Sequence, residues 1–380
     1  MIDVVVVGGG LAGAASAYYL AKEGVAVVLL ERGDLNTQAS GSNAGSIHAQ
    51  IPHEPFVTKG EDWARTFAPT IPIMMEGIRL WREVEAELGI DLEVATPGGL
   101  LVAASEAQMR EVVAKARIER EQGLPVEILS RADLHALAPY VADDLVGGAL
   151  CPIEGKANPL AAVPAFARAA ERLGARIERF TSVRAISREG GSFVVETSRG
   201  RVHARRIVNA AGADAAAVAR MVGVALPLEA HPIQVTVSEP VAPIVRHLLY
   251  FAGGKLTLKQ TPVGSLLIGG GWPSRLDQES GLLSPDPASL GANLALACRV
   301  VPGVAGARVV RTWPALVNGT DDWRPILGEP PGVPGFFMAI FPWMGFTAGP
   351  IAARLVADLV VGRRPAIDIA AFAPGSSRAA

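Results

Sequence analysis

A glycine-rich turn near the N-terminus restricts the fold of this chain more than any other feature. Gly8, Gly10 and Gly13 follow the apolar run Val4–Val7, and a helical pattern begins within this motif. Glu31 ends the next apolar run, 18 residues after Gly13. This strand, glycine turn, helix and acidic residue form the fingerprint of a dinucleotide-binding βαβ unit. The alternative is a chance glycine turn in an ordinary α/β protein.

Each residue of the fingerprint has a physical task. Gly8 makes the tight turn, Gly10 lets the backbone approach a pyrophosphate, and Gly13 allows close packing of helix on strand. The helix then begins at Leu11 and Ala12, where free N–H groups and the positive end of the helix dipole face the phosphates. Glu31 would accept the hydroxyls of the adenosine ribose and repel a 2′-phosphate.

The fingerprint alone does not distinguish NAD from FAD, but two later segments favour a flavin. The run Ile207–Gly212 ends a strand in the small residues Ala211 and Gly212, which allow a cofactor to lie close to the backbone. Late in the chain, Gly345–Pro350 forms a glycine turn that leads into the last helix. A helix N-terminus of this kind stabilises the negative charge of a reduced flavin, whereas a nicotinamide has no such need.

Composition excludes several other classes of protein. The chain has 380 residues, of which 50% are hydrophobic and 19% are charged, and its formal net charge is −2. We therefore expect a globular protein that does not bind nucleic acid, since no excess positive charge is present. Two cysteines, Cys151 and Cys298, cannot build a disulfide framework or an iron–sulfur cluster, and the histidines show no metal-ligand spacing.

The order of predicted elements indicates two discontinuous domains. We predict a Rossmann-like α/β domain for FAD, formed by residues 1–80, 145–215 and 325–380. The second, substrate-binding domain is of α+β type with a mixed, largely antiparallel sheet, formed by residues 81–144 and 216–324. Prolines and glycines interrupt the longest uncharged window, so we expect no membrane span. The first strand follows Met1 almost directly, and we expect no targeting segment and a cytoplasmic location.

The motifs together resemble the D-amino-acid-oxidase-type flavoprotein family, which includes glycine oxidase, sarcosine oxidase and D-amino-acid dehydrogenase. Residues 40–48 and 341–350 are most similar to the B subunits of opine oxidases and of hydrogen cyanide synthase. The resemblance implies noncovalently bound FAD, extended between the domains. It also implies the cofactor-binding positions, which are Gly8, Gly10, Leu11, Ala12, Gly13, Glu31, Arg32, Ala39, Ser40, Ala44, Gly45, Ser46, Ile47, Val183, Ala211, Gly212, Gly345, Phe346 and Thr347.

Three departures from the family pattern bear on the substrate and the electron acceptor. Glycine-oxidase-type members hold the substrate carboxylate with an arginine, and Val317 stands at that position here. Sarcosine-oxidase-type members carry an oxygen-activating lysine on the strand that matches residues 266–268, where this chain has Leu267. The cysteine that tethers flavin in those members has no counterpart near Leu316 or Val317.

Two residues are candidates for catalysis. His48 directly follows the flavin loop and could orient a carboxylate or remove an ammonium proton, although a structural histidine fits the pattern as well. Lys259 ends the predicted strand Leu256–Leu258 and could face the cleft between the domains; the alternative is an exposed strand lysine. Arg324 is interpreted as a surface arginine in a salt bridge.

The resemblance implies a FAD-dependent dehydrogenase that oxidises the C–N bond of an amine, an opine, an imino acid or a D-amino acid. Hydride would pass to flavin N5, and the imine would hydrolyse in water. One alternative is an oxygen-using oxidase that produces hydrogen peroxide, and another is a flavin-binding electron-transfer subunit that is inactive alone. Because the chain cannot build a second redox centre, we expect partner subunits that carry further centres and a hetero-oligomer.

Overall fold

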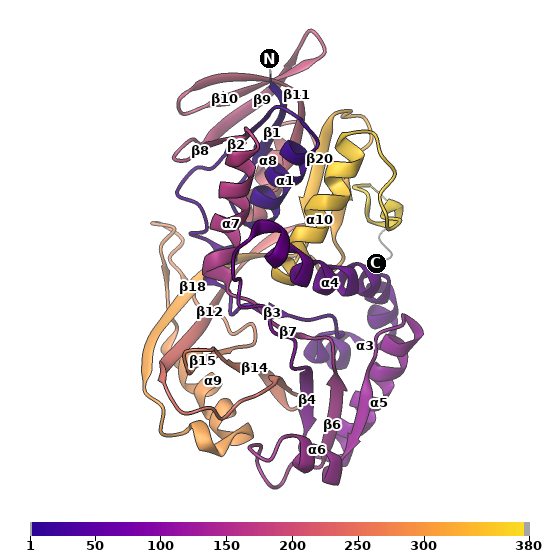
Figure 1. The fold of residues 1–380 in the computed structure, drawn as a ribbon, viewed down its shortest axis with the longest axis vertical. Helices are drawn as coiled ribbons and strands as arrows, with labels where there is room; N and C mark the ends of the chain where they lie inside the picture. The colour runs from indigo at the N-terminus through magenta and orange to yellow at the C-terminus, as the bar shows by residue number, and fades with distance from the viewer. Residues whose placement is uncertain (1, 376–380) are drawn as a thin grey trace.

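The computed structural model describes residues 2–375, whose strands form two large mixed sheets at opposite ends of the molecule (Figure 1). The first sheet is centred on β1, which pairs in parallel with β2 and β11. Its order is β19-β20-β11-β1-β2-β8, and the β9-β10 hairpin extends from β11. The strands are β1 Ile2–Val7, β2 Val27–Leu30, β8 Arg176–Glu178, β9 Val183–Glu189, β10 Ser192–Thr197, β11 Gly200–Asn209, β19 Ile326–Gly328 and β20 Phe336–Ile340.

Both faces of the first sheet are covered, which explains why β1 is an unbroken apolar run. Val4 and Val6 pack into the core under α1 (Leu11–Lys22), α7 (Pro159–Arg172) and α10 (Gly345–Val360), which lie side by side. Val5 and Val7 face the other side, where they join the core formed with α8 (Ala215–Arg220). A central strand of a parallel sheet is buried on both faces in this way.

The second sheet is antiparallel except for one pair, β4 with β13. Its order is β18-β12-β15-β14-β13-β4-β6-β5. The strands are β4 Gly99–Ala103, β5 Glu127–Ser130, β6 Gly147–Cys151, β12 Glu229–Pro240, β13 Leu248–Phe251, β14 Gly254–Gln260, β15 Ser265–Gly269 and β18 Val309–Gly319. The helices associated with it are α5 Glu106–Glu121, α6 Arg131–Leu137 and α9 Pro287–Val300.

Short elements lie where the two sheets meet (Figure 1). The residues after β2 form α2 (Ala39–Ser42) and β3 (Ser46–Ile47), and β3 pairs with β7 (Gly155–Lys156). Two longer helices follow, α3 (His53–Phe67) and α4 (Ile71–Leu88), and α4 packs on α10. The remaining elements are the hairpin β16 Arg275–Leu276 with β17 Leu283–Ser284, and the 3-10 turns η1 Ala68–Thr70, η2 Gly212–Asp214, η3 Pro302–Val304 and η4 Ala370–Phe372.

The predicted fold class is confirmed, with one difference in the last helix. The sequence placed its start near Ile351 with Pro350 in the first turn, but α10 begins at Gly345 and contains Pro350. Pro350 has no N–H for the carbonyl four residues earlier. That carbonyl, Phe346 O, accepts a hydrogen bond from Trp81 Nε1 of α4 at 3.2 Å instead. The contact compensates for the proline and allows the longer helix.

The domain boundaries stay a prediction, and β6, within the predicted segment 145–215, pairs in the second sheet. Among the helices of residues 2–375, none is both long and apolar enough to cross a bilayer. Both cysteines are free thiols, Cys151 in the core and Cys298 half-buried on α9. Burial raises the pKa of the Cys151 thiol well above its ordinary value.

Candidate functional site: a cofactor cleft and the pocket beside it

The glycine motif at the junction of β1 and α1 leaves no room for a side chain at Gly8 or Gly13. Gly8 has φ +109°, and a Cβ there would lie 2.5 Å from Ala210 O. A Cβ at Gly13 would lie 1.8 Å from Gly8 O. Gly10 is different, because its φ of −81° suits any residue and a Cβ would approach only the Ser40 hydroxyl, at 2.9 Å. Gly10 therefore keeps space free beside the start of α1.

Glu31 lies at the open end of β2, next to this turn. Its carboxylate accepts hydrogen bonds from Gly9 N and Gly33 N, both at 2.7 Å. The neighbouring Arg32 points elsewhere and forms an exposed ion pair with Asp214 at 2.8 Å. The structure thus places the predicted acid, and not the predicted arginine, against the glycine turn.

Two further predicted segments border the same end of the sheet. Thr181 N donates to Glu31 O at 2.7 Å, which brings Val183, at the start of β9, close to the end of β2. Ala210 N donates to Val7 O at 2.9 Å, so Ala211 and Gly212 follow directly beside the turn. Segments separated by more than a hundred residues therefore surround the Gly8–Gly13 motif.

The predicted flavin loop is anchored from both sheets. Ser40 of α2 accepts a hydrogen bond from Leu11 N at 2.9 Å, which connects the loop to the start of α1. Ser42 O accepts one from Trp313 Nε1 of β18 at 2.7 Å. Gly45 has φ +73°, and a Cβ there would lie 2.2 Å from Ala157 O. Ala39 and Ala44 belong to the same loop, and Ala44 is buried.

The start of α10 meets this loop, although the two segments are 299 residues apart in sequence. Thr347 Oγ1 accepts a hydrogen bond from His48 N at 2.9 Å and donates one to Ser46 O at 3.4 Å. No side chain in the described part of the chain caps the N-terminus of α10, so its dipole is directed at the region around Gly345 and Phe346. Ile47 is fully buried behind the contact.

These features fit FAD. The space kept free at Gly10, the acid at the end of β2 and the uncapped helix end beside the Ser46–His48 segment correspond to pyrophosphate, ribose and flavin ring respectively. The residues that would hold the cofactor are those predicted, and Arg32 adjoins them through its ion pair with Asp214, which follows Ala211 and Gly212. Each assignment to a part of FAD stays a prediction.

A cavity of about 1060 Å³ opens beside the predicted flavin region. Its wall includes Ser46, His48, Tyr250, Val317 and Phe346, together with residues of α3, β12 and β14. It thus connects the loop and the start of α10 with the second sheet. Val317, which the sequence analysis matches to the arginine position of glycine-oxidase-type members, is among the lining residues. A pocket of this size accommodates a drug-sized molecule.

His48 lies on the cavity wall, half-buried, with its ring centroid 6.2 Å from that of Tyr250. Burial and the positive charge of Lys259 lower the pKa of His48 to about 4. The ring is therefore neutral near pH 7 and has one nitrogen free to accept a proton.

Lys259 is buried, so its interpretation as an exposed strand lysine is wrong. Its side chain is 2% exposed, and its Nζ donates to Ser46 Oγ of the flavin loop at 2.5 Å. The side chain extends from β14, where it is paired with Leu267 of β15. Burial, and then the charge of Lys156, lower the pKa of Lys259 to about 7. The sequence analysis missed this burial because Lys259 lies at the end of a strand that alternates only weakly.

Arg324 also differs from its interpretation as a surface residue in a salt bridge. It is 9% exposed, its guanidinium donates to Ala371 O at 2.8 Å, and its Cζ lies 5.3 Å from the Phe372 ring centroid. Arg324 thus fastens the C-terminal segment and is not part of the cavity wall.

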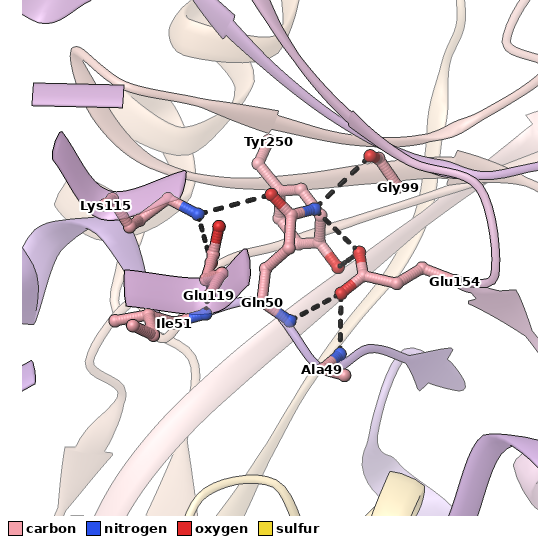
Figure 2. A network of polar contacts seen from close by, with 8 residues as sticks. All are labelled: Ala49, Gln50, Ile51, Gly99, Lys115, Glu119, Glu154 and Tyr250. Atoms are coloured by element: carbon pink, nitrogen blue, oxygen red, sulfur yellow. Dashed lines mark hydrogen bonds and ion pairs between the residues drawn. The ribbon is translucent and has the colours of Figure 1, made fainter. Parts of the chain in front are cut away.

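Sequence reasoning missed a buried polar network beside the cavity, which we call the carboxylate cluster (Figure 2); Gln50, Lys115 and Tyr250 of this cluster line the cavity. Its members are Gln50, Lys115, Glu119, Glu154 and Tyr250. Glu154 accepts hydrogen bonds from Ala49 N at 2.6 Å, Gln50 N at 2.7 Å, Gln50 Nε2 at 2.9 Å and Tyr250 OH at 3.2 Å. This carboxylate therefore holds both the backbone after His48 and the Tyr250 side chain.

The second carboxylate of the cluster holds the next residue of the same segment. Glu119 accepts a hydrogen bond from Ile51 N at 2.7 Å and pairs with Lys115 Nζ at 2.5 Å. Burial raises the pKa of both Glu119 and Glu154, and the nearby Lys115 opposes that shift. Lys115 and Glu119 are four residues apart on α5, a spacing that usually indicates a solvated pair. Nothing in the local sequence indicates that this pair is buried.

Within residues 2–375, no group of histidine, cysteine and acidic side chains is arranged to hold a metal ion.

Comparison with known proteins identifies similar chains over nearly the whole length. A family model described as FAD dependent oxidoreductase (DAO) matches residues 3–359. The beta subunit of sarcosine oxidase from Rhizobium meliloti (strain 1021) is 28% identical over 381 residues, which cover 97% of this chain and 87% of that protein. The B subunit of opine oxidase from Rhizobium meliloti is 28% identical over 346 residues, 89% of this chain and 87% of that one.

A glycine oxidase is similar in both sequence and structure. The enzyme of Geobacillus kaustophilus (strain HTA426) is 29% identical over 383 residues, which cover 97% of this chain and 96% of the enzyme. A crystal structure of glycine oxidase from Geobacillus kaustophilus superimposes with a TM-score of 0.86 at 27% identity, covering 99% of each chain.

Proposed function

Because the chain belongs to the DAO family of FAD-dependent oxidoreductases, we propose that it oxidises the C–N bond of an amine or an N-substituted amino acid. The family predicted from the sequence is confirmed, and so is FAD as its cofactor. Relatives named for sarcosine, glycine and opine oxidation support the amine class. The observation that carries the proposal is the cavity in which His48, the flavin loop and the start of α10 meet.

Bound FAD would supply the two-electron acceptor, and the protein must present the amine in neutral form. His48 can contribute by orienting the amine. Its pKa of about 4 keeps the imidazole neutral near pH 7, so the ring can hydrogen-bond a neutral amine, but it is too weak a base to take a proton from an ammonium group. Thr347 fixes the His48 backbone, and the carboxylate cluster fixes the residues that follow.

Lys259 is the second candidate. Its pKa of about 7 leaves a substantial neutral fraction at physiological pH, and its amine is held on Ser46 of the flavin loop. Lys259 could therefore exchange a proton at Nζ or place a positive charge beside the loop. Its burial and its hydrogen bond to Ser46 support a catalytic role more strongly than its position at the end of a predicted strand.

The side chain at position 317 bears on how a substrate carboxylate could be bound. Val317 faces the cavity, and no arginine of residues 2–375 lines it. Without an arginine there, a bidentate clamp worth about 1.5 to 3 kcal/mol is absent for a small α-amino acid. A substrate carboxylate would then be held by another group. Among amines we favour a secondary amine such as an opine, an imino acid or another N-substituted amino acid, which the relative named for opine oxidation supports.

For the electron acceptor, we propose a dehydrogenase that passes electrons to a partner. The names of two relatives, a beta subunit and a B subunit, support partner subunits with further redox centres. Affinity purification from the native host, with mass and metal analysis, tests this proposal. Recovery of the chain alone, while the extract keeps its full dehydrogenase activity, would contradict it.

One observation favours the oxidase alternative. Related oxidases use a lysine near the flavin, and Lys259 reaches the flavin loop from the strand beside Leu267. Oxygen consumption distinguishes the two functions. A dehydrogenase reduced by substrate under argon reoxidises slowly in air, whereas an oxidase consumes oxygen at the rate of substrate turnover.

Reduction by substrate is the central test of the proposal. A panel of N-substituted amino acids, imino acids and D-amino acids is mixed with the FAD-loaded protein without oxygen, and loss of flavin colour is recorded. At least one secondary amine should bleach the flavin. If none does, and the isolated chain reduces no dye, the third alternative of an electron-transfer subunit inactive alone gains support.

The cofactor should be noncovalent, because neither cysteine lies at the flavin loop. Acid precipitation should release the yellow colour into the supernatant, whereas a coloured pellet would contradict this assignment. The cytoplasmic location stays a prediction from the sequence.

A further inference from the structure

Three aromatic rings form one side of the cavity, which we call the tryptophan wall. Its members are His231, Trp323 and Trp343, and all three line the cavity. The ring centroids of Trp323 and Trp343 are 4.9 Å apart and the planes lie 19° from parallel. His231 packs on Trp343 with a centroid distance of 4.5 Å. Trp343 precedes the start of α10 by two residues, so the wall adjoins the predicted flavin region.

Both tryptophans have a backbone conformation that bulky residues rarely adopt. Each has φ +59°, in the left-handed region. Hydrogen bonds to the end of β18 and the residue after it hold Trp343, since its N donates to Asn318 O at 3.0 Å and its Nε1 donates to Thr320 O at 3.2 Å. Trp323 N donates to Thr320 O at 3.3 Å. Backbone strain of this kind persists where the surrounding structure enforces it, and it concentrates at ligand-binding sites. The strain here serves to present two indole rings to the cavity.

Gly319, the last residue of β18, leaves room for the rings of the tryptophan wall. A Cβ at Gly319 would lie 2.4 Å from Trp343 Cζ2 and 2.6 Å from the His231 ring, so only glycine allows this arrangement. The next residue, Thr320, is 6% exposed and lines the cavity, and its hydroxyl has no hydrogen-bond partner among residues 2–375. The end of β18 thus shapes the cavity wall around the rings.

We propose that the tryptophan wall is a specificity subsite for an aromatic substituent on the amine substrate. The stacked rings put aromatic, apolar surface on the cavity wall, against which an aromatic substituent can pack, and Val317 of β18 adds apolar surface and no charge. The inference rests on the proposed function, because it names the substituent that the oxidised amine carries.

The test uses two thioether acids, benzylthioacetate and methylthioacetate, with the FAD-loaded full-length protein. Neither has an amine to oxidise, so calorimetric titration measures binding without turnover. We expect the wild-type protein to bind benzylthioacetate at least about tenfold more tightly than methylthioacetate. Trp323→Leu should reduce this ratio to below about threefold and change the methylthioacetate affinity by less than about twofold.

Two further variants make the result specific to the wall. Trp323→Phe retains an aromatic ring and should keep most of the preference. Trp63→Phe is the matched control, because Trp63 contacts Trp323 edge-on, with centroids 6.0 Å apart, and does not line the cavity. Flavin absorbance and the thermal midpoint verify that each variant is folded and loaded. If Trp323→Leu does not fold, Trp323→Phe and Trp323→Met provide the comparison of aromatic with flexible side chain.

Equal affinity of the two acids in the wild-type protein would overturn the proposal, and so would an equal loss for both in Trp323→Leu. A separate measurement tests the underlying function. N-benzylglycine and N-methylglycine are compared as reductants of the flavin under argon, and the benzyl compound should have the higher kcat/KM. If neither bleaches the flavin while the thioether preference holds, the proposed function fails and the aromatic subsite stands.

Discussion

The glycine turn and the carboxylate cluster flank the same site but depend on their residues in opposite ways. At the turn, the backbone itself requires the residue type, because Gly8 and Gly13 have no room for a Cβ. In the cluster, Lys115, Glu119 and Glu154 are ordinary surface residue types that acquire their roles through burial. A residue type that the local backbone requires can therefore be recognised in the sequence, whereas a role that depends on burial can be recognised only in the folded chain.

We expect the greatest loss of stability from a substitution in the glycine turn, which tests whether the backbone there requires glycine. Gly13→Ala places a Cβ 1.8 Å from Gly8 O, a backbone atom that cannot move without displacing β1. We expect a loss of at least about 3 kcal/mol in unfolding free energy, measured by urea denaturation. Gly291→Ala on α9 is the control, because its Cβ meets nothing within 4 Å. A near-normal midpoint for Gly13→Ala would contradict this account of the turn.

Disrupting the carboxylate cluster should lower the free energy of unfolding by a similar amount. Lys115→Met leaves the buried Glu119 without its cation, and we expect a loss of about 3 to 5 kcal/mol in unfolding free energy. The double variant Lys115→Met with Glu119→Leu removes both charges and should be more stable than Lys115→Met alone. Urea denaturation measures both. If Lys115→Met loses less than about 1 kcal/mol, the cluster behaves like an exposed ion pair.

Gly10 should separate cofactor binding from folding. Gly10→Val is compatible with the backbone conformation and displaces only the Ser40 hydroxyl, but its side chain occupies the space assigned to pyrophosphate. We expect FAD affinity to fall about 100-fold, or about 2.7 kcal/mol, with little change in the stability of the apoprotein. Fluorescence titration with FAD and apoprotein melting measure the two quantities. Unchanged FAD affinity would remove Gly10 from the site.

The titration of Lys259 should give a smaller effect, a dependence of protein stability on pH. Its folded pKa of about 7 lies below the ordinary value of 10.5, so between these values the unfolded chain holds a proton that the folded protein has released. Wild-type stability should therefore rise with pH through this window. Lys259→Met should be more stable than wild type near about pH 6, and the difference should shrink toward about pH 10. Lys255→Met, a half-exposed lysine of β14, should show no such trend; a flat Lys259→Met difference would contradict the lowered pKa.

Much of the fold was predictable from the sequence, because its signals are local. The βαβ unit and the fold class follow from the apolar run Val4–Val7, the glycine motif and the order of the predicted elements. The start of α10 was not predictable, since it depends on Trp81 bonding a carbonyl that Pro350 leaves free. That compensation comes from another helix.

The residues of the candidate site also fall into those that a local motif identifies and those that it does not. Glu31 and the Ser46–His48 segment stand in recognisable motifs, and the structure brings them to the predicted edge of the sheet. The burial of Lys259, the anchoring of the flavin loop by Trp313 and the presentation of two tryptophans by loops around Gly319 depend on contacts between distant segments. A single sequence carries no local pattern for such contacts.

The contact between Thr347 and His48 joins two segments that are made at different times during synthesis, so we expect the predicted cofactor site to be completed late. The glycine turn is among the first residues to leave the ribosome, but the neighbours of β1 and the helix end that faces the flavin loop come much later. Until α10 has emerged, a nascent chain has one half of the binding surface and an incomplete sheet edge. Cofactor loading is thus a late event, and a chain shortened before α10 lacks the segment that closes the flavin side of the site.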